Sequence, residues 1–421
     1  MYPIDAPGIR DAAARPARLR RVAPTVWLLG FTSLFTDVSS EMVNSVLPAY
    51  LVLYLRFSPL EFGVLDGLYQ GVTAVLRPAG GLVADRWRRH KEVAAAGYLL
   101  SAVCKLGLLA AGGAWSALAG VIALDRAGKG LRTAPRDAMI ALASAREDRA
   151  TVFGVHRALD AAGAMLGPLA AFGVLAFVRG GFDVVFVTSF CAAMIGSGIL
   201  ILLVTPPRAD AAAAAPPAMS LRFLLAPLRE ARFRTIAIVG GILSVMTISD
   251  GFLYLRLQNR LSTSVEALPL MYVGTSLAYL LLAAPAGRLA DRWGRGRVLL
   301  TGYAMLGLTY AALFVPVAHP AFVVVVLMLL GAYYAATDGV LVALASTAVP
   351  PAGYATGLAV LTTVTSLSRL LASVTFGALW TWRGPEFAVA CYGAGLACGA
   401  LAGAALLGRT GNLATHETSE A

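Results

Sequence analysis

The segment Gly287–Arg297, "GRLADRWGRGR", places five charged residues among eleven in a chain that is otherwise strongly apolar. A near copy, "GGLVADRWRRHK", occupies Gly80–Lys91. Both copies contain the pattern G-x-x-A-D-R-W, which begins at Gly81 in the first and at Gly287 in the second. A charged block that recurs between long apolar runs indicates that the chain consists of two related parts.

A second pair of similar segments supports this interpretation. The segment "DAMIALAS" starts at Asp137, and "DGVLVALAS" starts at Asp338 with one residue inserted. The distance between these copies is close to the distance between the two charged blocks. The sequence therefore predicts two homologous halves. Internal repeats of this kind are typical of secondary transporters, which bind their substrate between the halves near the middle of the membrane.

The composition indicates a membrane protein. The chain has 421 residues, of which 58% are hydrophobic and 14% are charged, whereas soluble domains carry about 25% charged residues. Apolar runs of roughly 20 residues, the length of a membrane-spanning helix, recur throughout. We predict an all-α polytopic membrane protein with about twelve transmembrane helices in two pseudo-symmetric six-helix bundles. The predicted spans are 25–54, 60–83, 93–113, 116–142, 151–177, 183–205, 235–257, 266–289, 297–318, 321–346, 354–380 and 386–408.

The net charge of +11 is unevenly distributed along the chain. Arginine and lysine concentrate before the first span, after the second, fourth and eighth spans, and in the central break. This is the positive-inside pattern, which predicts that both termini are cytoplasmic in a multi-pass protein of the cell inner (plasma) membrane. It also argues against nucleic-acid binding. The predicted regions are a cytoplasmic N-terminal tail (1–24), an N-terminal six-helix bundle (25–205), a cytoplasmic central linker (206–234), a C-terminal six-helix bundle (235–408) and a cytoplasmic C-terminal tail (409–421).

The charged blocks identify a family resemblance. They are similar to the signature loop of the major facilitator superfamily, G-x-x-x-D-R-x-G-R-[KR], which joins its second and third helices. In that family the loop holds the cytoplasmic side closed, which implies a latch role for the matching residues here, with two latch acids, Asp85 and Asp291, and their partners Arg86, Arg89, Arg292 and Arg295. The first copy has Arg88 where glycine is usual, so we expect a turn of different shape there. The implied latch residues are Gly81, Asp85, Arg86, Arg89, Gly287, Asp291, Arg292, Gly294 and Arg295.

Two further motifs extend the resemblance. "LDRAGKG" in the fourth span resembles the family pattern R-x-x-x-G through Arg126 and Gly130, and in the family this arginine is tied to proton coupling. "GVHRALDAAGAMLGP" in the fifth span resembles the antiporter signature G-x8-G-x3-G-P. The resemblance thus implies an exporter that exchanges its substrate for protons, as prokaryotic drug:proton antiporters do. The matching residues of the antiporter motif are Gly154, Gly163, Gly167 and Pro168.

Charged residues inside the spans are the candidates for the transport site. An ionised side chain at the membrane centre costs at least about 2.5–3.5 kcal/mol, so it usually faces a cavity or a partner. Asp37, Glu41 and Asn44 lie at i, i+4 and i+7 on one face of the first span. Two carboxylates one helical turn apart repel each other, and proton binding relieves that repulsion. Arg126 of the fourth span is a candidate to neutralise Asp37 or Glu41. The residues that we predict for proton coupling are Asp37, Glu41, Arg126 and Asp160.

A second set of polar residues predicts the substrate cavity. Asp250 and Asp338 are single acids in long apolar runs, and tyrosines lie near them. Arg369 in the eleventh span is a candidate counter-ion for Asp338 or for an anionic ligand. A purely structural role for each of these side chains stays an alternative. The predicted cavity residues are Asn44, Asp250, Tyr254, Tyr334, Asp338 and Arg369.

We therefore predict a secondary active transporter, most simply a proton-coupled exporter of small amphipathic or toxic compounds. Its partners would be the substrate, protons and the lipid bilayer, and we expect a monomer. A proton-linked importer of a small organic solute and a non-transporting sensor on the same fold stay open. The sequence contains no G-x-x-x-x-G-K-[ST] loop, catalytic triad or metal-ligand cluster, so we expect no enzyme activity, cofactor or metal.

Overall fold

The structure is a computed structural model of the whole chain. It describes residues 22–144, 148–205, 226–261, 264–316, 319–349 and 354–417. All regular elements in these ranges are helices, and none of the described residues forms a strand. The predicted N-terminal tail (1–24) lies outside the described residues except at its end, as do most of the linker (206–234) and the last residues of the C-terminal tail (409–421).

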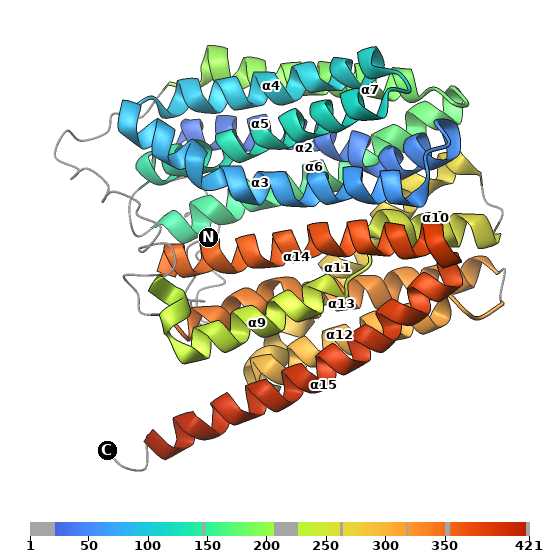
Figure 1. Cartoon of the computed structure of the whole chain (residues 1–421). Coiled ribbons are helices and arrows are strands. Elements are labelled where there is room, and N and C mark those ends of the chain that lie inside the picture. Colours follow the sequence, from blue (N-terminus) through green and yellow to red (C-terminus); the bar gives the residue numbers. More distant parts are fainter. Residues whose placement is uncertain are drawn as a thin grey trace. The chain divides into compact units, whose positions relative to one another are not determined.

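Twelve helical stretches follow the predicted spans in order, which confirms the predicted all-α fold (Figure 1). Eight of these stretches are long and apolar enough to cross a membrane; the others are α2, α3, α5 and α12. The principal helices are α2 (Pro24–Pro48), α3 (Pro59–Trp87), α4 (His90–Ala111), α5 (Trp115–Leu142), α6 (Arg149–Phe177), α7 (Phe182–Gly198), α9 (Ala231–Val245), α10 (Asp250–Leu261), α11 (Leu268–Trp293), α12 (Arg295–Ala312), α13 (Pro320–Ser346), α14 (Tyr354–Arg383) and α15 (Pro385–Glu417).

The seventh span differs from the continuous helix that the sequence predicts. It breaks between Val245, where α9 ends, and Asp250, where α10 begins. The Tyr310 hydroxyl of α12 occupies the break, where it accepts from the Ile248 amide at 2.7 Å and donates to the Met246 carbonyl at 3.0 Å. A buried tyrosine thus satisfies backbone groups that have no water partner in a membrane. The break leaves Asp250 in the first turn of a new helix.

The first and sixth spans end in short π-helical segments, η2 (Ala49–Tyr54) and η4 (Ile199–Leu203). The first of these follows Pro48 directly. A proline has no amide hydrogen for the i→i−4 bond, which favours a change of helical winding at this point.

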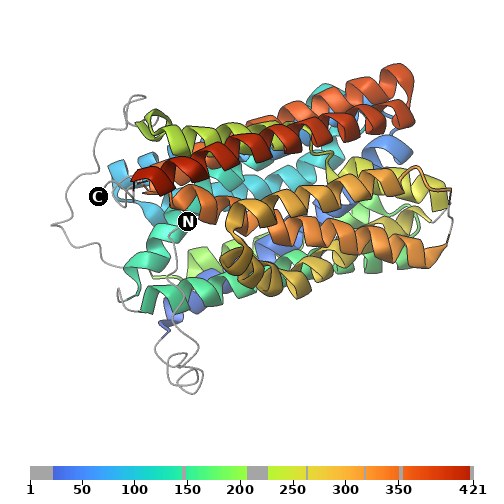
Figure 2. The ribbon, with the colours of Figure 1, turned by 90° about the horizontal axis from the view of Figure 1, so that it is seen from below.

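The described chain groups into two compact units. One contains Ile4–Tyr50 and Val72–Ala218, and the other contains Leu51–Gly71 and Met219–Ala421, in each case as far as the chain is described. In the first unit, α2 packs against α6 and α7, and α4 packs against α5. In the second unit, α13 packs against α11 and α12, and α15 packs against α9, α12 and α14 (Figures 1 and 2).

Candidate functional site

The acidic face of α2 lies against the glycines of α6. A Cβ atom added to Gly163 would lie 2.6 Å from the Leu34 carbonyl oxygen and 3.2 Å from the Asp37 Cβ. A Cβ added to Gly167 would lie 2.7 Å from the Val38 carbonyl oxygen and 2.8 Å from the Glu41 Cβ. Glycine is therefore required at both positions for this separation of the helix backbones. The antiporter-like motif thus packs on the same turns of α2 that present Asp37 and Glu41.

The acidic pair on α2 has polar and cationic neighbours, among them Arg136 of α5, which interacts electrostatically with Asp37. Asn44 donates a hydrogen bond of 2.8 Å to Glu41, as their i, i+3 spacing allows. Lys129 of α5 interacts electrostatically with both Asp37 and Glu41. All five side chains are partly buried. The first unit thus brings together two carboxylates, an amide, an ammonium and a guanidinium.

The remaining motif residues of α6 have different surroundings. A Cβ added to Gly154 would meet nothing within 4 Å, so no close approach of helices requires glycine there. Pro168 lies inside α6 directly after Gly167. Because proline lacks an amide hydrogen, the carbonyl of Ala164 loses its usual helical donor. Close packing in the motif is thus confined to Gly163 and Gly167.

A second ionic cluster joins α2, α3, α5 and α6. The Arg136 side chain donates to Ser33 at 3.0 Å and to Asp137 at 2.9 Å, and its guanidinium lies 3.9 Å from Asp160. Arg77 of α3 donates to the other oxygen of Asp137 at 3.3 Å. Arg136 lies inside α5, near the end of the predicted fourth span (116–142). Asp160 therefore belongs to a cluster of four charged groups that come from three helices.

His156 lies one helical turn before Asp160 on α6. Its Nε2 lies 3.6 Å from the Asp160 carboxylate, which is too far for a hydrogen bond. Both ring nitrogens are buried and have no hydrogen-bond partner among the described residues. The pair lies at i, i+4 on α6, on the face that the sequence predicts.

A third ionic group is fully enclosed within the first unit. Asp125 accepts from Lys105 of α4 at 2.9 Å and pairs with its neighbour Arg126. The side chains of Lys105, Asp125 and Arg126 are each at most 9% exposed. The sequence suggested that Arg126 neutralises Asp37 or Glu41, but its carboxylate partner in this group is Asp125. One acid here compensates two cations in a site without water access.

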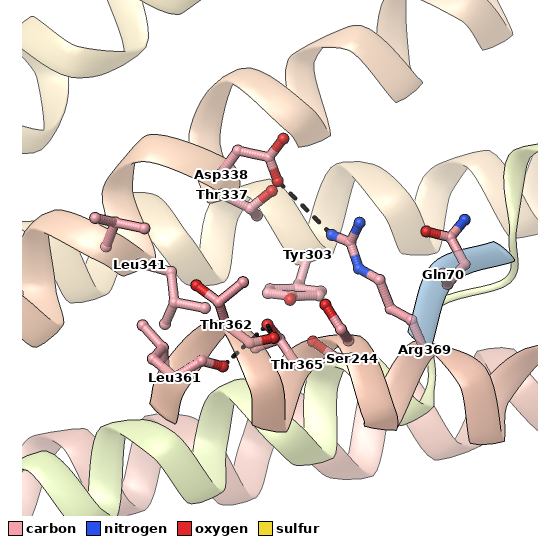
Figure 3. Close-up of a pocket in the computed structure, with 12 residues that line it drawn as sticks. Gln70, Ser244, Tyr303, Thr337, Asp338, Leu341, Leu361, Thr362, Thr365 and Arg369 are labelled. Atoms are coloured by element: carbon pink, nitrogen blue, oxygen red, sulfur yellow. Dashed lines mark hydrogen bonds and ion pairs between the residues drawn. The ribbon is translucent and has the colours of Figure 1, made fainter. Parts of the chain in front are cut away.

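In the second unit, five of the six predicted cavity residues lie around two hollows that share Asp338, whereas Asn44 lines neither hollow and instead bonds to Glu41 in the first unit. The larger, here called the hydroxyl cavity, has a volume of about 220 Å³ and lies among α9, α12, α13 and α14, with Gln70 of α3 at its edge. Arg369 of α14 points across it to Asp338, with 3.7 Å between nitrogen and oxygen (Figure 3). The other polar side chains around it are Ser244, Tyr303, Thr337, Thr362, Thr365 and Ser366.

The threonine hydroxyls around the hydroxyl cavity donate hydrogen bonds to backbone carbonyls of their own helices. Thr337 donates to the Tyr333 carbonyl at 2.8 Å, and Thr362 donates to the Leu358 carbonyl at 2.8 Å. These hydroxyls therefore offer mainly acceptor lone pairs to the cavity. Arg369, in contrast, offers a hydrogen-bond donor to the cavity, because its buried Nε has no acceptor among the described residues.

The smaller hollow, here called the tyrosine cavity, has a volume of about 180 Å³. Tyr334 of α13 donates a hydrogen bond of 2.7 Å to Asp250, and Tyr254 donates one of 2.7 Å to Thr275 of α11. The structure thus brings the predicted residues Asp250, Tyr254, Tyr334 and Asp338 to one hollow. The residues around it are Asp250, Tyr254, Tyr272, Thr275, Ser276, Tyr279, Tyr334 and Asp338.

The two charged blocks form turns of different shape. Arg88 and Gly294 occupy the same position in the repeat, and both have positive φ, 52° and 93°. At Gly294 the ψ of 134° is outside the left-handed helical region, so this conformation is essentially restricted to glycine. The first turn has two residues between its helices, Arg88 and Arg89, whereas the second has Gly294 alone.

The acids of these turns have different partners. Asp85 lies 2.9 Å from His90, where the sequence suggested Arg86 or Arg89. Asp291 lies 4.0 Å from Arg295, as the sequence suggested. Arg295 also donates to the Ala343 carbonyl of α13 at 2.8 Å, which ties the start of α12 to its neighbour. Gly81, Arg86, Arg89, Gly287 and Arg292 are exposed or half-buried around these contacts.

Sequence reasoning missed several charged groups that the structure places inside the helices. Asp66 of α3 accepts a hydrogen bond from Ser373 of α14, and it was visible as the only acid between Glu61 and Asp85 in the second span. Lys105 and Lys129 were visible in the same way, as lysines inside predicted spans. A search for every charge inside a span would have found them, but their partners come from other helices.

Comparison with known proteins places this arrangement in context. A family model described as "Major Facilitator Superfamily" matches residues 29–275 and 242–420. An uncharacterised MFS-type transporter of Methanocaldococcus jannaschii is 29% identical over 367 residues, which cover 86% of this chain and 89% of the relative. An uncharacterised protein of Mycobacterium tuberculosis is 38% identical over 167 residues, or 40% of each chain.

Solved structures share the fold at low sequence identity. A single-residue variant of the nucleoside transporter NupG has a TM-score of 0.77 and 17% identity, with 91% of this chain and 99% of that chain covered. A POT family transporter in complex with a thioalcohol-conjugated peptide has a TM-score of 0.73 and 14% identity, with 89% and 94% covered. At these identities the likeness supports the fold alone.

Proposed function

The chain belongs to the major facilitator superfamily and is a multi-pass membrane transporter of small solutes, and on that premise we propose that it exports small amphipathic compounds in exchange for protons. The proposal includes the finer assignments that the sequence suggests: a drug:proton antiporter type, a monomer in the cytoplasmic membrane, both termini in the cytoplasm, and bundles bounded at 25–205 and 235–408. The two charged turns serve as its cytoplasmic latches.

The observation on which this proposal depends is the contact between the acidic face of α2 and the glycines of α6. Gly163 and Gly167 bring the two backbones together at the turns that present Asp37 and Glu41. Lys129 interacts electrostatically with both acids. A carboxylate in this position attracts the ammonium when it is ionised and loses that attraction when it binds a proton.

This arrangement suggests how a proton could bias the transporter. A ligand shifts a two-state equilibrium only by its differential affinity for the two states. If the states differ in the distance between α2 and α5, protonation of Asp37 or Glu41 favours the state in which Lys129 is more distant. The cluster of Asp160, Arg136 and Asp137 adjoins the same helices and offers a second position for the proton. Export then requires that substrate and proton favour opposite states.

Uptake of a small organic solute is the second candidate. The observation that favours it is the buried Arg369 Nε in the hydroxyl cavity, which lacks an acceptor among the described residues. A carboxylate or phosphate of a solute would supply that acceptor. A cavity rich in hydroxyl groups would suit a polar solute of this kind.

Proton flux in sealed proteoliposomes distinguishes the two candidates. The protein is reconstituted with a trapped pH dye, a proton gradient is imposed, and a panel of amphipathic and polar compounds is added. Protons that move opposite to the substrate support export by exchange. Protons that move with the substrate contradict export and support uptake. Folded protein that responds to no compound of the panel would leave the substrate unidentified and favour the sensor role.

A further inference from the structure

The tyrosine cavity combines aromatic walls with negative charge. Four tyrosines and two aspartates are among the eight residues around it, and no basic residue is among them. Its two acids, Asp250 and Asp338, come from different helices, α10 and α13. A third acid, Asp66, interacts electrostatically with Asp250. Arg369 interacts electrostatically with both acids, but it lines the hydroxyl cavity and is not among the residues around this hollow. The hollow therefore presents a net negative charge to a ligand.

Hydrogen bonds and ring contacts fix the tyrosine rings. The hydroxyl groups of Tyr334 and Tyr254 are engaged by Asp250 and Thr275. The rings of Tyr254 and Tyr272 meet edge to face, with centroids 4.6 Å apart. Rings held in this way cannot turn freely, so their faces are preorganised. The face of an aromatic ring attracts a cation that comes within about 6 Å of its centroid.

The chemistry of the walls favours an organic cation over a metal ion. The described residues contain no group of three or more His, Cys, Asp or Glu side chains that could hold a metal. Alkylated ammonium groups, in contrast, are recognised by aromatic rings together with carboxylates. The hollow has a volume of about 180 Å³, so the ligand that it holds is small.

We propose that the tyrosine cavity binds a small organic cation, and that the bound cation replaces Arg369 as the counter-ion of Asp338. The proposal rests on the transport function above and specifies the class of compound transported. Asp338 belongs to both cavities, and its 3.7 Å distance to Arg369 leaves the pair loose. A cation between the tyrosine rings and Asp338 competes with the guanidinium for the same carboxylate. Substrate binding then changes the pairing between α13 and α14.

Equilibrium binding to the purified full-length protein in detergent tests this inference without any proton gradient. Radiolabelled choline is the probe, because it has a permanent charge and no N–H donor. Tetramethylammonium and 3,3-dimethylbutan-1-ol serve as competitors. The alcohol has the shape of choline but carries a carbon atom in place of the charged nitrogen. We expect saturable choline binding that tetramethylammonium displaces, and at least tenfold weaker displacement by the neutral alcohol.

Variants locate the binding site. Asp250→Asn should weaken choline binding at least tenfold, and Tyr272→Leu should weaken it about fivefold or more, whereas Tyr272→Phe keeps the ring and should lose less. Arg369→Gln should strengthen choline binding several-fold, since Asp338 then has no competing partner. Glu386→Gln is the matched control, because this acid of the same unit is exposed and pairs with Arg256 outside the cavity, and it should bind like the wild type.

The outcomes separate this inference from the proposed function. Absence of saturable choline binding to folded protein, equal displacement by the neutral alcohol, or unchanged binding in Asp250→Asn would each overturn the cation site. Proton flux triggered by neutral compounds in such a case would leave proton exchange standing. Choline binding that never triggers proton flux would support the cation site and contradict proton exchange for this ligand.

Discussion

Gly167 of α6 packs so closely on α2 that a Cβ atom at this position would lie 2.8 Å from the Cβ of Glu41. This contact joins the antiporter-like motif to the acidic face of α2. It explains the motif in physical terms, because a side chain at Gly167 would force apart the helices that position the acids.

Gly167→Ala should therefore destabilise the protein. The added methyl group meets the Val38 carbonyl and the Glu41 Cβ, and overpacking of this kind costs about 1–3 kcal/mol. The measurement is the thermal midpoint of the purified protein in detergent. Gly154→Ala on the same helix is the control. Its added methyl group meets nothing within 4 Å, so it should be neutral or stabilise by up to about 1 kcal/mol. Equal midpoints for the two variants would refute the packing explanation.

The enclosed group of Lys105, Asp125 and Arg126 should respond unequally to loss of charge. Asp125→Asn leaves two buried cations without their carboxylate, and loss of one partner from a buried ion pair costs about 3–5 kcal/mol. Lys105→Met leaves a neutral pair of Asp125 and Arg126, so its cost should be clearly smaller. Thermal midpoints compare the two variants. A larger loss in Lys105→Met would contradict the charge balance described here.

The Asp338 and Arg369 pair should contribute little to stability. The two side chains are 49% and 32% exposed, and pairs this accessible contribute about 0–1 kcal/mol. A double-mutant cycle of Asp338→Asn and Arg369→Gln, measured by thermal unfolding, should give a coupling energy within that range. Transport should nevertheless fail in Asp338→Asn, which would identify a functional defect. A coupling energy of several kcal/mol would instead indicate a structural lock.

Exchange of the central residues of the two repeated turns should change the stability of the protein by unequal amounts. Gly294→Arg should destabilise by roughly 1–3 kcal/mol, because the backbone at this position is essentially restricted to glycine. Arg88→Gly should be neutral or stabilise by up to about 1 kcal/mol, because glycine adopts positive φ without a steric penalty. Arg89→Gly is the control, since φ is −121° there and no gain is expected. A destabilising Arg88→Gly would show that its side chain matters more than its backbone.

Much of the fold was predictable because membrane spans are local. Each required only an apolar run of sufficient length, and the twelve runs correspond to the observed helices. The break between Val245 and Asp250 was not predictable. Its free backbone groups bond to the hydroxyl of Tyr310, which is more than sixty residues away in the sequence. Hydropathy alone cannot reveal a helix that is interrupted by a side chain from another helix.

The candidate site was predictable to the extent that helix faces determine it. The spacing of Asp37, Glu41 and Asn44 placed them together, and the repeat singled out Asp137 and Asp338. In the structure each repeated acid faces an arginine from another helix, Arg77 for Asp137 and Arg369 for Asp338.

The ion-pair partner of Arg126 was not predictable, for a general reason. Arg126 has several acids within plausible reach, and only the packing of the helices selects among them. Lys129 was overlooked although it lies inside a predicted span, because its partners Asp37 and Glu41 come from another helix.

The most direct test of proton coupling compares two kinds of transport in the same proteoliposomes. The compound that triggers proton flux in the wild type is followed in gradient-driven transport and in exchange at equal pH. Both assays are run on the wild type, Asp37→Asn and Glu41→Gln. The control is Asp183→Asn, because Asp183 is an exposed acid at the start of α7. The account predicts that Asp37→Asn or Glu41→Gln retains exchange but loses proton flux, while the control retains both. Proton flux at the wild-type rate in both α2 variants would contradict it.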